Sequence, residues 1–174
     1  FEKTQDGERV MKVLSKRMQR FGLELHPQKT RLVTFTPPRW EARGKGPATF
    51  DFLGFTWYWR KTRKGRWPAM CKTMSARLSR AIRSAYDFCR SHRHESIKTQ
   101  HDGLSRRLRG HFNYFGVSGN VRSLHVLREQ VRVIWFKWLN RRSQRQSIDW
   151  KRYRVFLHAH PLPAAQVYVV IWSG

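Results

Sequence analysis

The sequence predicts an α+β fold, with a β-rich first part followed by a mainly helical second part. Up to about residue 72, short segments rich in aromatic and β-branched residues lie between turns that contain Gly and Pro. Beyond Met74, apolar residues recur at intervals of three and four positions through most of the remaining chain. This change of period divides the chain into residues 1–72 and residues 73–174.

The first element is an amphipathic helix that begins near Asp6 and ends at Gly22. Apolar residues recur along it at helical spacing, while Arg, Lys and Gln fill its other side. The apolar positions are Val10, Val13, Leu14, Met18 and Phe21. The pattern predicts a helix with one apolar side and one basic side.

Two short strands are expected after this helix, at residues 23–25 and 31–35. Both segments are short and combine apolar with polar or β-branched residues. Residues 26–29 join them, and Pro27 disfavours helix in the residue before it. The beginning of the chain is therefore predicted to run helix, strand, turn, strand.

A β-hairpin is expected in the aromatic segment that comes next. A basic loop bounded by Pro37 and Pro47 leads to residues 49–59, which are rich in aromatic and β-forming residues. Residues 61–65 are polar and contain Gly, which predicts a turn, and residues 66–68 are expected to lead away from the hairpin.

Three amphipathic helices are expected in the second part. The first begins after Met74, the second near Ser96 and the third after Gly119. Their apolar stripes contain, in this order, Leu78, Ile82, Ala85, Tyr86 and Cys89; Ile97, Leu104, Leu108, Phe112 and Phe115; and Leu124, Leu127, Val131, Ile134, Trp135 and Trp138. Basic residues are expected on the outer faces, namely Arg77, Arg80, Arg83 and Arg90 on the first helix and Arg122, Arg128, Arg132, Lys137 and Arg141 on the third. Helices of this length predict a small bundle, followed by a short helix at residues 150–156 and an irregular tail.

The charge of the chain indicates a polyanionic partner. Lys and Arg number 36 against 11 Asp and Glu, which leaves a formal net charge of +25 on 174 residues. A single exposed arginine usually does no more than keep a helix surface soluble. Here, however, few carboxylates are present to offset the total positive charge of the basic residues. No run of 18 or more apolar residues occurs, and the basic residues are spread along the whole chain. Nucleic acid is therefore favoured over a membrane as the partner.

Four short motifs resemble one family. The residues at 50–55 read Phe-Asp-Phe-Leu-Gly-Phe, and those at 25–33 read Leu-His-Pro-Gln-Lys-Thr-Arg-Leu-Val. Together they resemble the last palm motifs of reverse transcriptases encoded by bacterial group II introns. His-Phe-Asn-Tyr-Phe-Gly at 111–116 is similar to an aromatic-rich segment of the family's thumb or maturase domain, and His-Pro-Leu-Pro at 160–163 is similar to a stretch near its end. The resemblance covers nearly the whole chain.

The resemblance implies both a fold and a function. The chain would form the end of a reverse-transcriptase palm, with a primer-grip hairpin, followed by a helical thumb. The thumb and maturase domain of this family clamps the template-primer duplex and holds intron RNA during splicing and RNA-directed DNA synthesis. The expected partners are structured intron RNA, a template-primer duplex, and the upstream palm and fingers of the same protein, in the bacterial cytoplasm in association with the nucleoid.

The primer grip of the family matches Phe52, Leu53 and Gly54. A tight hairpin that contains Gly lets the backbone approach a primer end closely and hold it rigidly. Core packing is the more ordinary role for the phenyl rings of Phe50, Phe52 and Phe55, so the functional role is assigned to the Leu53–Gly54 backbone.

Contacts with nucleic acid are expected mainly from the helical part. Basic side chains would contact phosphates, and exposed aromatic rings would stack on unpaired bases. The candidates are Arg77, Arg80, Arg83, Arg106, Arg107, Arg109 and Lys137, with Tyr114 and Trp150 as stacking groups. For Tyr114, Trp135 and Trp138, core packing is the stronger alternative because they lie on or near the apolar stripes.

No complete catalytic centre is expected within this chain. Two-metal nucleotidyl transfer needs clustered carboxylates, whereas the Asp residues here are scattered, and the family's Tyr-x-Asp-Asp turn is expected just upstream of Phe1. Lys29 matches a palm lysine near the incoming nucleotide, where an ammonium would steady pyrophosphate charge or donate a proton; a surface lysine in a turn is the alternative. The fragment alone is expected to be inactive and to hold no metal or cofactor, with Mg²⁺ expected for the full-length polymerase.

Two other functions fit the same residues. One is a non-catalytic RNA-binding maturase-like module that keeps the palm remnant only as a scaffold. The other is a fragment of a reverse transcriptase domesticated for defence. Cys71 and Cys89 lack the repeated spacing of a disulfide framework, so buried free thiols in a reducing compartment are expected in each case.

Overall fold

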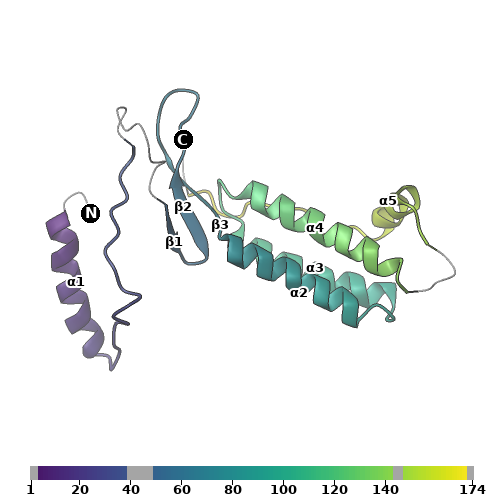
Figure 1. Ribbon diagram of the computed structural model, residues 1–174, viewed down its shortest axis with the longest axis horizontal. Helices are drawn as coiled ribbons and strands as arrows, with labels where there is room; N and C mark the ends of the chain where they lie inside the picture. The colour runs from purple at the N-terminus through teal and green to yellow at the C-terminus, as the bar shows by residue number, and fades with distance from the viewer. Residues whose placement is uncertain (1–3, 39–48, 143–146, 172–174) are drawn as a thin grey trace.

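A computed structural model describes residues 4–38, 49–142 and 147–171 of the chain. Within these ranges the protein contains five helices and one three-stranded antiparallel sheet, a mixed architecture that agrees with the predicted α+β class. The elements in chain order are α1 (Thr4–Gln19), β1 (Phe50–Phe52), β2 (Phe55–Trp59), β3 (Ala69–Thr73), α2 (Ser75–Ser91), α3 (Ile97–Phe115), α4 (Val121–Leu139) and α5 (Trp150–Ala159). The sheet lies between α1 and a bundle of α2, α3 and α4 (Figure 1).

The helix predicted at the beginning of the chain is confirmed, but the two strands predicted after it are wrong. Residues 23–25 and 31–35 are extended, and neither segment pairs with a strand in the described part of the chain. The turn between them is present, since the amide of Thr30 donates to the carbonyl of His26 at 2.9 Å. Their residue types suit a strand, but a strand also requires a neighbouring backbone in register, which local sequence does not specify.

The segment after this turn contacts its neighbours through side chains instead. The ring of Phe35 lies 4.6 Å from that of Trp59 and 4.8 Å from that of Phe50, measured between centroids. Leu32 covers Gly7 so closely that a β-carbon there would lie 2.8 Å from a Leu32 methyl group. The segment thus links α1 to the sheet by packing rather than by strand pairing.

The aromatic segment forms two hairpins rather than one, in the strand order β1-β2-β3. Leu53 and Gly54 connect β1 to β2 with φ angles of +50° and +78°, the geometry of a tight type I′ turn. The polar turn predicted at residues 61–65 is present, since the amide of Gly65 donates to the carbonyl of Thr62. Residues 66–68 do not lead away from the sheet, because the chain returns as β3 and pairs with β2. The basic loop predicted before β1 lies largely at residues 39–48, outside the described residues.

One face of the sheet is aromatic, and it is only partly covered. Because directly opposed residues share a face, the register Phe50↔Trp57 and Phe52↔Phe55 places all four rings on the same side. Phe55 is buried at 9% exposure, whereas Phe52 is 57% exposed, so the expectation that Phe52 fills the core is wrong. Phe55 lies nearer to α3, where its ring meets that of Phe115 at 5.1 Å.

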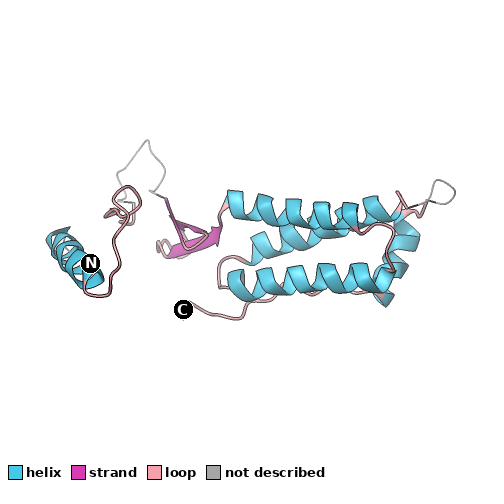
Figure 2. Ribbon diagram, turned by 90° about the horizontal axis from the view of Figure 1, so that it is seen from below, coloured by secondary structure: helices cyan, strands magenta, loops and turns pink. Residues whose placement is uncertain are grey.

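The three predicted amphipathic helices are confirmed as α2, α3 and α4, which lie side by side (Figure 2). Their apolar stripes meet in one core, in which Trp135 and Trp138 are both buried, as expected. The Nε1 group of Trp135 donates to the Oε1 atom of buried Gln100 at 3.0 Å, which satisfies both polar groups inside the core. The residues buried in the bundle include Ala85, Phe88, Cys89, Leu104, Leu108, Phe112, Leu124, Leu127, Val131 and Ile134.

A buried asparagine joins the sheet to the bundle. Asn120 is fully buried just before α4, and its Oδ1 atom accepts a hydrogen bond from the amide of Thr73 in β3 at 2.7 Å. Its Nδ2 group donates to the Thr73 hydroxyl and to the carbonyl of Phe115, both at 2.8 Å. One side chain therefore fixes β3, the end of α3 and the start of α4 to one another.

The short helix predicted near the end of the chain is present as α5, which Asp149 caps by accepting from the amide of Arg152. Tyr153 of α5 is fully buried and donates its hydroxyl to the carbonyl of Arg132 in α4 at 2.8 Å; burial raises the pKa of that hydroxyl above its usual range. Arg128 and Arg132 are half-buried rather than outward-facing as predicted, because α5 and the following chain cover that side of α4.

The predicted irregular tail runs back along the bundle toward the sheet (Figure 1). Its last described residues lie beside the α3–α4 connection, where Val169 and Val117 form a parallel bridge and the amide of Ser118 donates to the carbonyl of Val169 at 2.9 Å. The side chain of Val170 is 67% exposed in this segment. The tail therefore adds an exposed apolar edge next to the sheet.

Both cysteines are free and buried, as expected. Burial raises the pKa of the Cys89 thiol to about 12, against a smaller opposing effect of Arg107, and it raises the pKa of Cys71 as well. Across residues 4–38, 49–142 and 147–171, no helix combines the length and the apolar character needed to span a membrane.

Candidate nucleic-acid interface

The β1–β2 turn presents an exposed and strained residue at its tip. Leu53 has a φ of +50°, a left-handed conformation that costs a residue with a bulky side chain about 1–2 kcal/mol. Its side chain is nevertheless 65% exposed, so burial in the core does not offset this strain. Strained conformations of this kind concentrate at binding and catalytic sites.

The turn is fixed firmly to the helical bundle. The hydroxyl of Tyr114, near the end of α3, donates to the carbonyl of Leu53 at 3.1 Å, and the amide of Met74 donates to the carbonyl of Gly54 at 2.9 Å. A β-carbon on Gly54 would lie 3.3 Å from the ring of Phe115, so the backbone approaches this ring as closely as glycine allows. The tip is therefore a rigid projection rather than a loose loop.

Tyr114 combines a structural contact with an accessible ring. Its ring is 57% exposed and lies parallel to that of Phe55 with centroids 6.3 Å apart, so it is not a core residue. The hydroxyl is engaged by Leu53, which holds the ring in one orientation beside the tip. Tyr114 thus positions the turn, and one part of its ring stays open to solvent.

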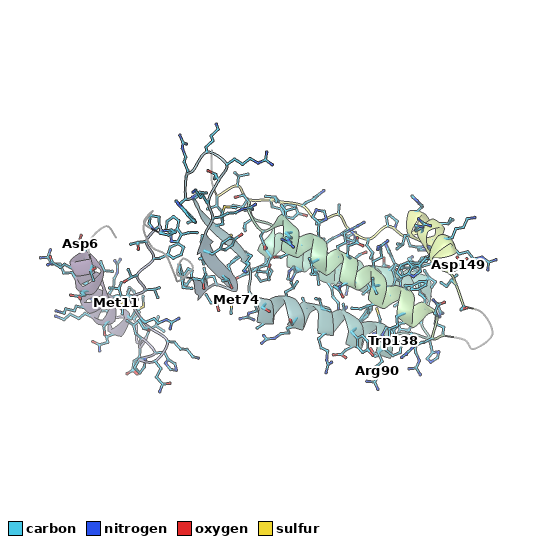
Figure 3. The ribbon with its side chains drawn as sticks, turned by 45° about the horizontal axis from the view of Figure 1, so that its top comes forward. Asp6, Met11, Met74, Arg90, Trp138 and Asp149 are labelled. Atoms are coloured by element: carbon cyan, nitrogen blue, oxygen red, sulfur yellow. The ribbon has the colours of Figure 1, made fainter. Side chains whose placement is uncertain are left out.

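An arginine row begins at the turn and continues along α2. The Cγ atom of Arg77 lies 3.9 Å from the position of a β-carbon on Gly54, so the first arginine adjoins the tip directly. Arg80 and Arg83 follow at intervals of three residues, and all three side chains are exposed. Figure 3 marks Met74 at the sheet end of α2 and Arg90 toward its other end, which gives the direction of the row.

Two more of the predicted basic residues flank this row. The guanidinium of Arg107 lies over the ring of Phe88 at 4.0 Å, and the ammonium of Lys137 lies 5.3 Å from the ring centre of Tyr86. Tyr86 and Phe88 are two residues apart on α2, which places them about 200° apart around the helix. Arg107 and Lys137 therefore border α2 on opposite sides.

We call this combined surface the α2 face. It consists of Leu53, Gly54, Arg77, Arg80, Arg83, Arg107, Tyr114 and Lys137. The acidic group described nearest to the row is Asp87, whose carboxylate lies 3.8 Å from Arg83. Both side chains of that pair are mostly exposed, so the pair holds Arg83 only weakly. The α2 face is therefore strongly positive along its whole length.

Several predicted residues lie elsewhere. Arg106 and Arg109 are exposed on α3, but they point about 100° and about 200° away from Arg107 around that helix. Lys29 is exposed in the turn after α1, and no described contact joins it to the hairpin tip. Trp150 is 44% exposed, but it stacks on Phe136 with centroids 4.0 Å apart, so one face of its ring is already used for packing.

A half-buried histidine lies behind the α2 face. His111 lines a cavity of about 240 Å³ between α2, α3 and α4, together with Arg107, Ala85 and Val131 among others. Its Nε2 atom is buried and bonds to no other described group, and burial lowers the pKa of the imidazole from 6.5 to about 4. At neutral pH the ring is therefore uncharged, and it adds nothing to the positive potential.

Sequence reasoning missed the residues that hold the tip in place. Asn120 anchors β3 through a bond to Thr73 that spans 47 residues of sequence, and nothing in the local pattern signals such a contact.

Within the described ranges no three His, Cys, Asp or Glu side chains come together as a candidate metal site. No family model, curated protein or solved structure matches this chain in the comparisons with known proteins.

Proposed function

We propose that this chain binds nucleic acid through the α2 face, as the C-terminal palm and thumb of a group II intron reverse transcriptase and maturase. On this proposal the arginine row contacts the phosphates of a template-primer duplex or of structured intron RNA. The hairpin tip then contacts the primer strand. The nucleotidyl-transfer chemistry, with its Mg²⁺ ions, belongs to an upstream palm in the bacterial cytoplasm.

The observation that carries the proposal is that the strained hairpin tip lies next to the start of the arginine row. A basic helix alone has many ordinary explanations, and so does an exposed hairpin. Here Arg77 Cγ lies 3.9 Å from where a β-carbon on Gly54 would be, and the hydroxyl of Tyr114 donates to the carbonyl of Leu53. A rigid protrusion beside a line of cations suits a strand end that must be held at a fixed position and orientation.

The chemistry of binding on this face is mainly electrostatic. Arg77, Arg80 and Arg83 each offer a planar guanidinium, which donates to phosphate oxygens in a fixed fork geometry. Each phosphate that is neutralised on a duplex adds about 0.9 to the steepness with which affinity falls with salt. Stacking of a terminal base on the open part of Tyr114 would add sequence-tolerant affinity of about 1–3 kcal/mol.

The test is a salt titration of binding to an RNA–DNA duplex with a recessed primer end. For the triple variant R77Q/R80Q/R83Q, the slope of log affinity against log salt is expected to become shallower by about 2–3, since roughly one phosphate contact is lost per arginine. The matched control R106Q/R109Q/R122Q removes three exposed arginines away from the α2 face and is expected to change the slope by less than about 1.

A comparison of duplex ends tests the part played by the hairpin. The wild-type chain is expected to bind a recessed primer end more tightly than a blunt duplex of equal length. At a recessed end the primer strand alone ends beside the tip, whereas at a blunt end both strands end together. Equal losses in the two triple variants, together with equal affinity for both ends, would mean that net charge alone drives binding and would refute the proposal.

A further inference from the structure

A basic cavity lies on a different side of α4 from the α2 face. It encloses about 350 Å³ between α4, α5 and the His-Pro-Leu-Pro segment, and Arg128, Glu129, Arg132, Arg154, His158 and Leu162 line it together with Leu157 and Pro161. Arg132 and Lys137 are five residues apart on α4, which places their side chains about 140° apart around the helix. The cavity is therefore separate from the surface assigned above.

The walls of this cavity are held rigidly. Arg128 donates from Nε to the carbonyl of Pro163 at 3.1 Å and from Nη2 to that of Leu162 at 3.4 Å, which fixes the segment to α4. His101 of α3 contacts the carbonyl of Pro161 at 2.9 Å, and Tyr153 ties α5 to the backbone of α4. The basic groups therefore converge on a preformed space.

Arg132 lines the cavity, already pairs with one carboxylate and keeps one donor without a partner among the described residues. Its Nη2 atom lies 2.7 Å from a carboxylate oxygen of Glu129, the short distance of a charge-assisted hydrogen bond. Its Nε atom is buried and has no hydrogen-bond partner among the described residues. A buried donor without an acceptor is costly, and a phosphate oxygen is an acceptor of the charge and size that a guanidinium prefers.

The charges around the cavity are unbalanced in favour of an anion. Arg128, Arg132 and Arg154 line it against the one carboxylate of Glu129. Arg154 is exposed, forms no ion pair with another described residue, and extends from the α5 wall. Since Glu129 only partly offsets these arginines, a group with two or more acceptor oxygens would gain contacts that the carboxylate does not provide.

We propose that this cavity binds a phosphate group, with Arg132 and Arg154 as its principal ligands. The phosphate has two possible sources, a backbone phosphate of bound RNA and a free phosphate or nucleotide. The RNA form of this inference rests on the proposed function, whereas the binding of free phosphate does not. A phosphate bound here would place an RNA strand on a side of α4 different from that facing the duplex.

The first test uses inorganic phosphate and the full chain. Thermal unfolding is followed in phosphate and in chloride at equal ionic strength, for the wild type and for four variants. Glu129→Gln removes the one carboxylate among the described residues that line the cavity. It is expected to increase the stabilisation by phosphate, a gain that misfolding does not produce. Arg154→Gln is expected to reduce it. The controls with the same change of charge are Glu95→Gln and Arg152→Gln, both exposed and outside the cavity lining.

The second test measures binding of a structured RNA hairpin by the same variants. Arg154→Gln is expected to weaken binding about three- to fivefold and Glu129→Gln to strengthen it about threefold, beyond the changes in their controls. Changes in the phosphate response with no change in RNA affinity would identify a free phosphate or nucleotide as the ligand.

The outcomes separate the two proposals. If the wild type fails to bind RNA but phosphate still acts through Glu129 and Arg154, the proposed function fails and the phosphate cavity stands. If Glu129→Gln and Arg154→Gln match their controls in both tests, the cavity is not a phosphate site, whatever the α2 face binds.

Discussion

The helical bundle and the first helix have the same kind of sequence pattern and very different surroundings. In the bundle, Trp135 and Leu104 are completely buried. Val13 in α1 is 62% exposed, and Phe21, which follows the end of α1, is 72% exposed, although both lie on the apolar side of the helix that the sequence predicted there. Periodicity therefore predicts that a helix forms, but only the bundle supplies the neighbours that turn an apolar stripe into a core.

The largest expected difference comes from the aromatic residues of the two regions. Replacing Trp135 by Ala is expected to lower the free energy of unfolding by about 3–5 kcal/mol, because it opens a cavity and leaves the Oε1 atom of Gln100 without its donor. Replacing Phe21 by Ala is expected to cost less than about 0.5 kcal/mol. Urea unfolding followed by circular dichroism measures both. Similar costs for the two substitutions would refute the contrast between the regions.

The next effect concerns the joint between the sheet and the bundle. Asn120→Ala removes the acceptor of the Thr73 amide and two further bonds in a fully buried place. The expected loss of stability is about 2–3 kcal/mol, since buried partners are left unpaired. The exposed Asn113 on α3 provides the control, for which Ala is expected to be nearly neutral. Asn120 is not an anchor between the sheet and the bundle if the two variants unfold at the same urea concentration.

A smaller effect is expected at the hairpin tip, with opposite signs at adjacent residues. Gly54→Ala is expected to destabilise by about 1–2 kcal/mol, because alanine must adopt a positive φ and its β-carbon crowds Phe115. Leu53→Asn is expected to stabilise by about 0.5–1 kcal/mol, because asparagine tolerates the left-handed conformation better. The same urea measurement gives both values. A loss of stability in the asparagine variant would mean that Leu53 is not strained.

A further effect, seen only as the pH falls, is a pH dependence that His111 confers on the bundle. Its pKa is lowered by burial from 6.5 to about 4, so the unfolded chain takes up a proton before the folded chain does as the pH falls. The stability that comes from the neutral ring is fully present above about pH 6.5 and declines as the pH falls toward about 4. His111→Phe is expected to flatten this decline, which is measured as the wild-type minus variant difference in unfolding free energy. The matched control for the change of residue is His125→Phe, at an exposed position on α4.

Local sequence predicts which helix positions are buried or exposed, but not which distant segments of the chain lie close together. The positions buried in α2, α3 and α4 follow from residues three and four apart, and the exposed Arg77, Arg80 and Arg83 follow from the same spacing. The proximity of Gly54 to Arg77, by contrast, depends on how the β1–β2 turn meets the bundle. The sequence therefore predicted a binding role for each residue but not that the two lie close together.

The errors have a common physical cause. Residues 23–25 and 31–35 have suitable residue types for strands, yet they pair with no strand in the described part of the chain. β3 lacks a strong aromatic signal, yet it pairs with β2. Strand formation therefore depended on which backbone segments lie side by side in the fold. Arg128 and Arg132 were expected to face solvent because they carry charge. They are half-buried because α5 and the His-Pro-Leu-Pro segment fold back over α4, a long-range contact that a helical stripe does not reveal.

The central claim is that nucleic acid lies against the hairpin tip and the α2 face, and not simply against any exposed part of a chain with charge +25. A photocrosslinking benzoylphenylalanine placed at Leu53 tests this most directly, with the same group at Phe21 as the control. The two side chains are comparably exposed, at 65% and 72%. We expect the group at position 53 to crosslink to the primer strand of a recessed RNA–DNA duplex several times more often than the group at position 21. Equal crosslinking at the two positions, or a preference for position 21, would contradict it.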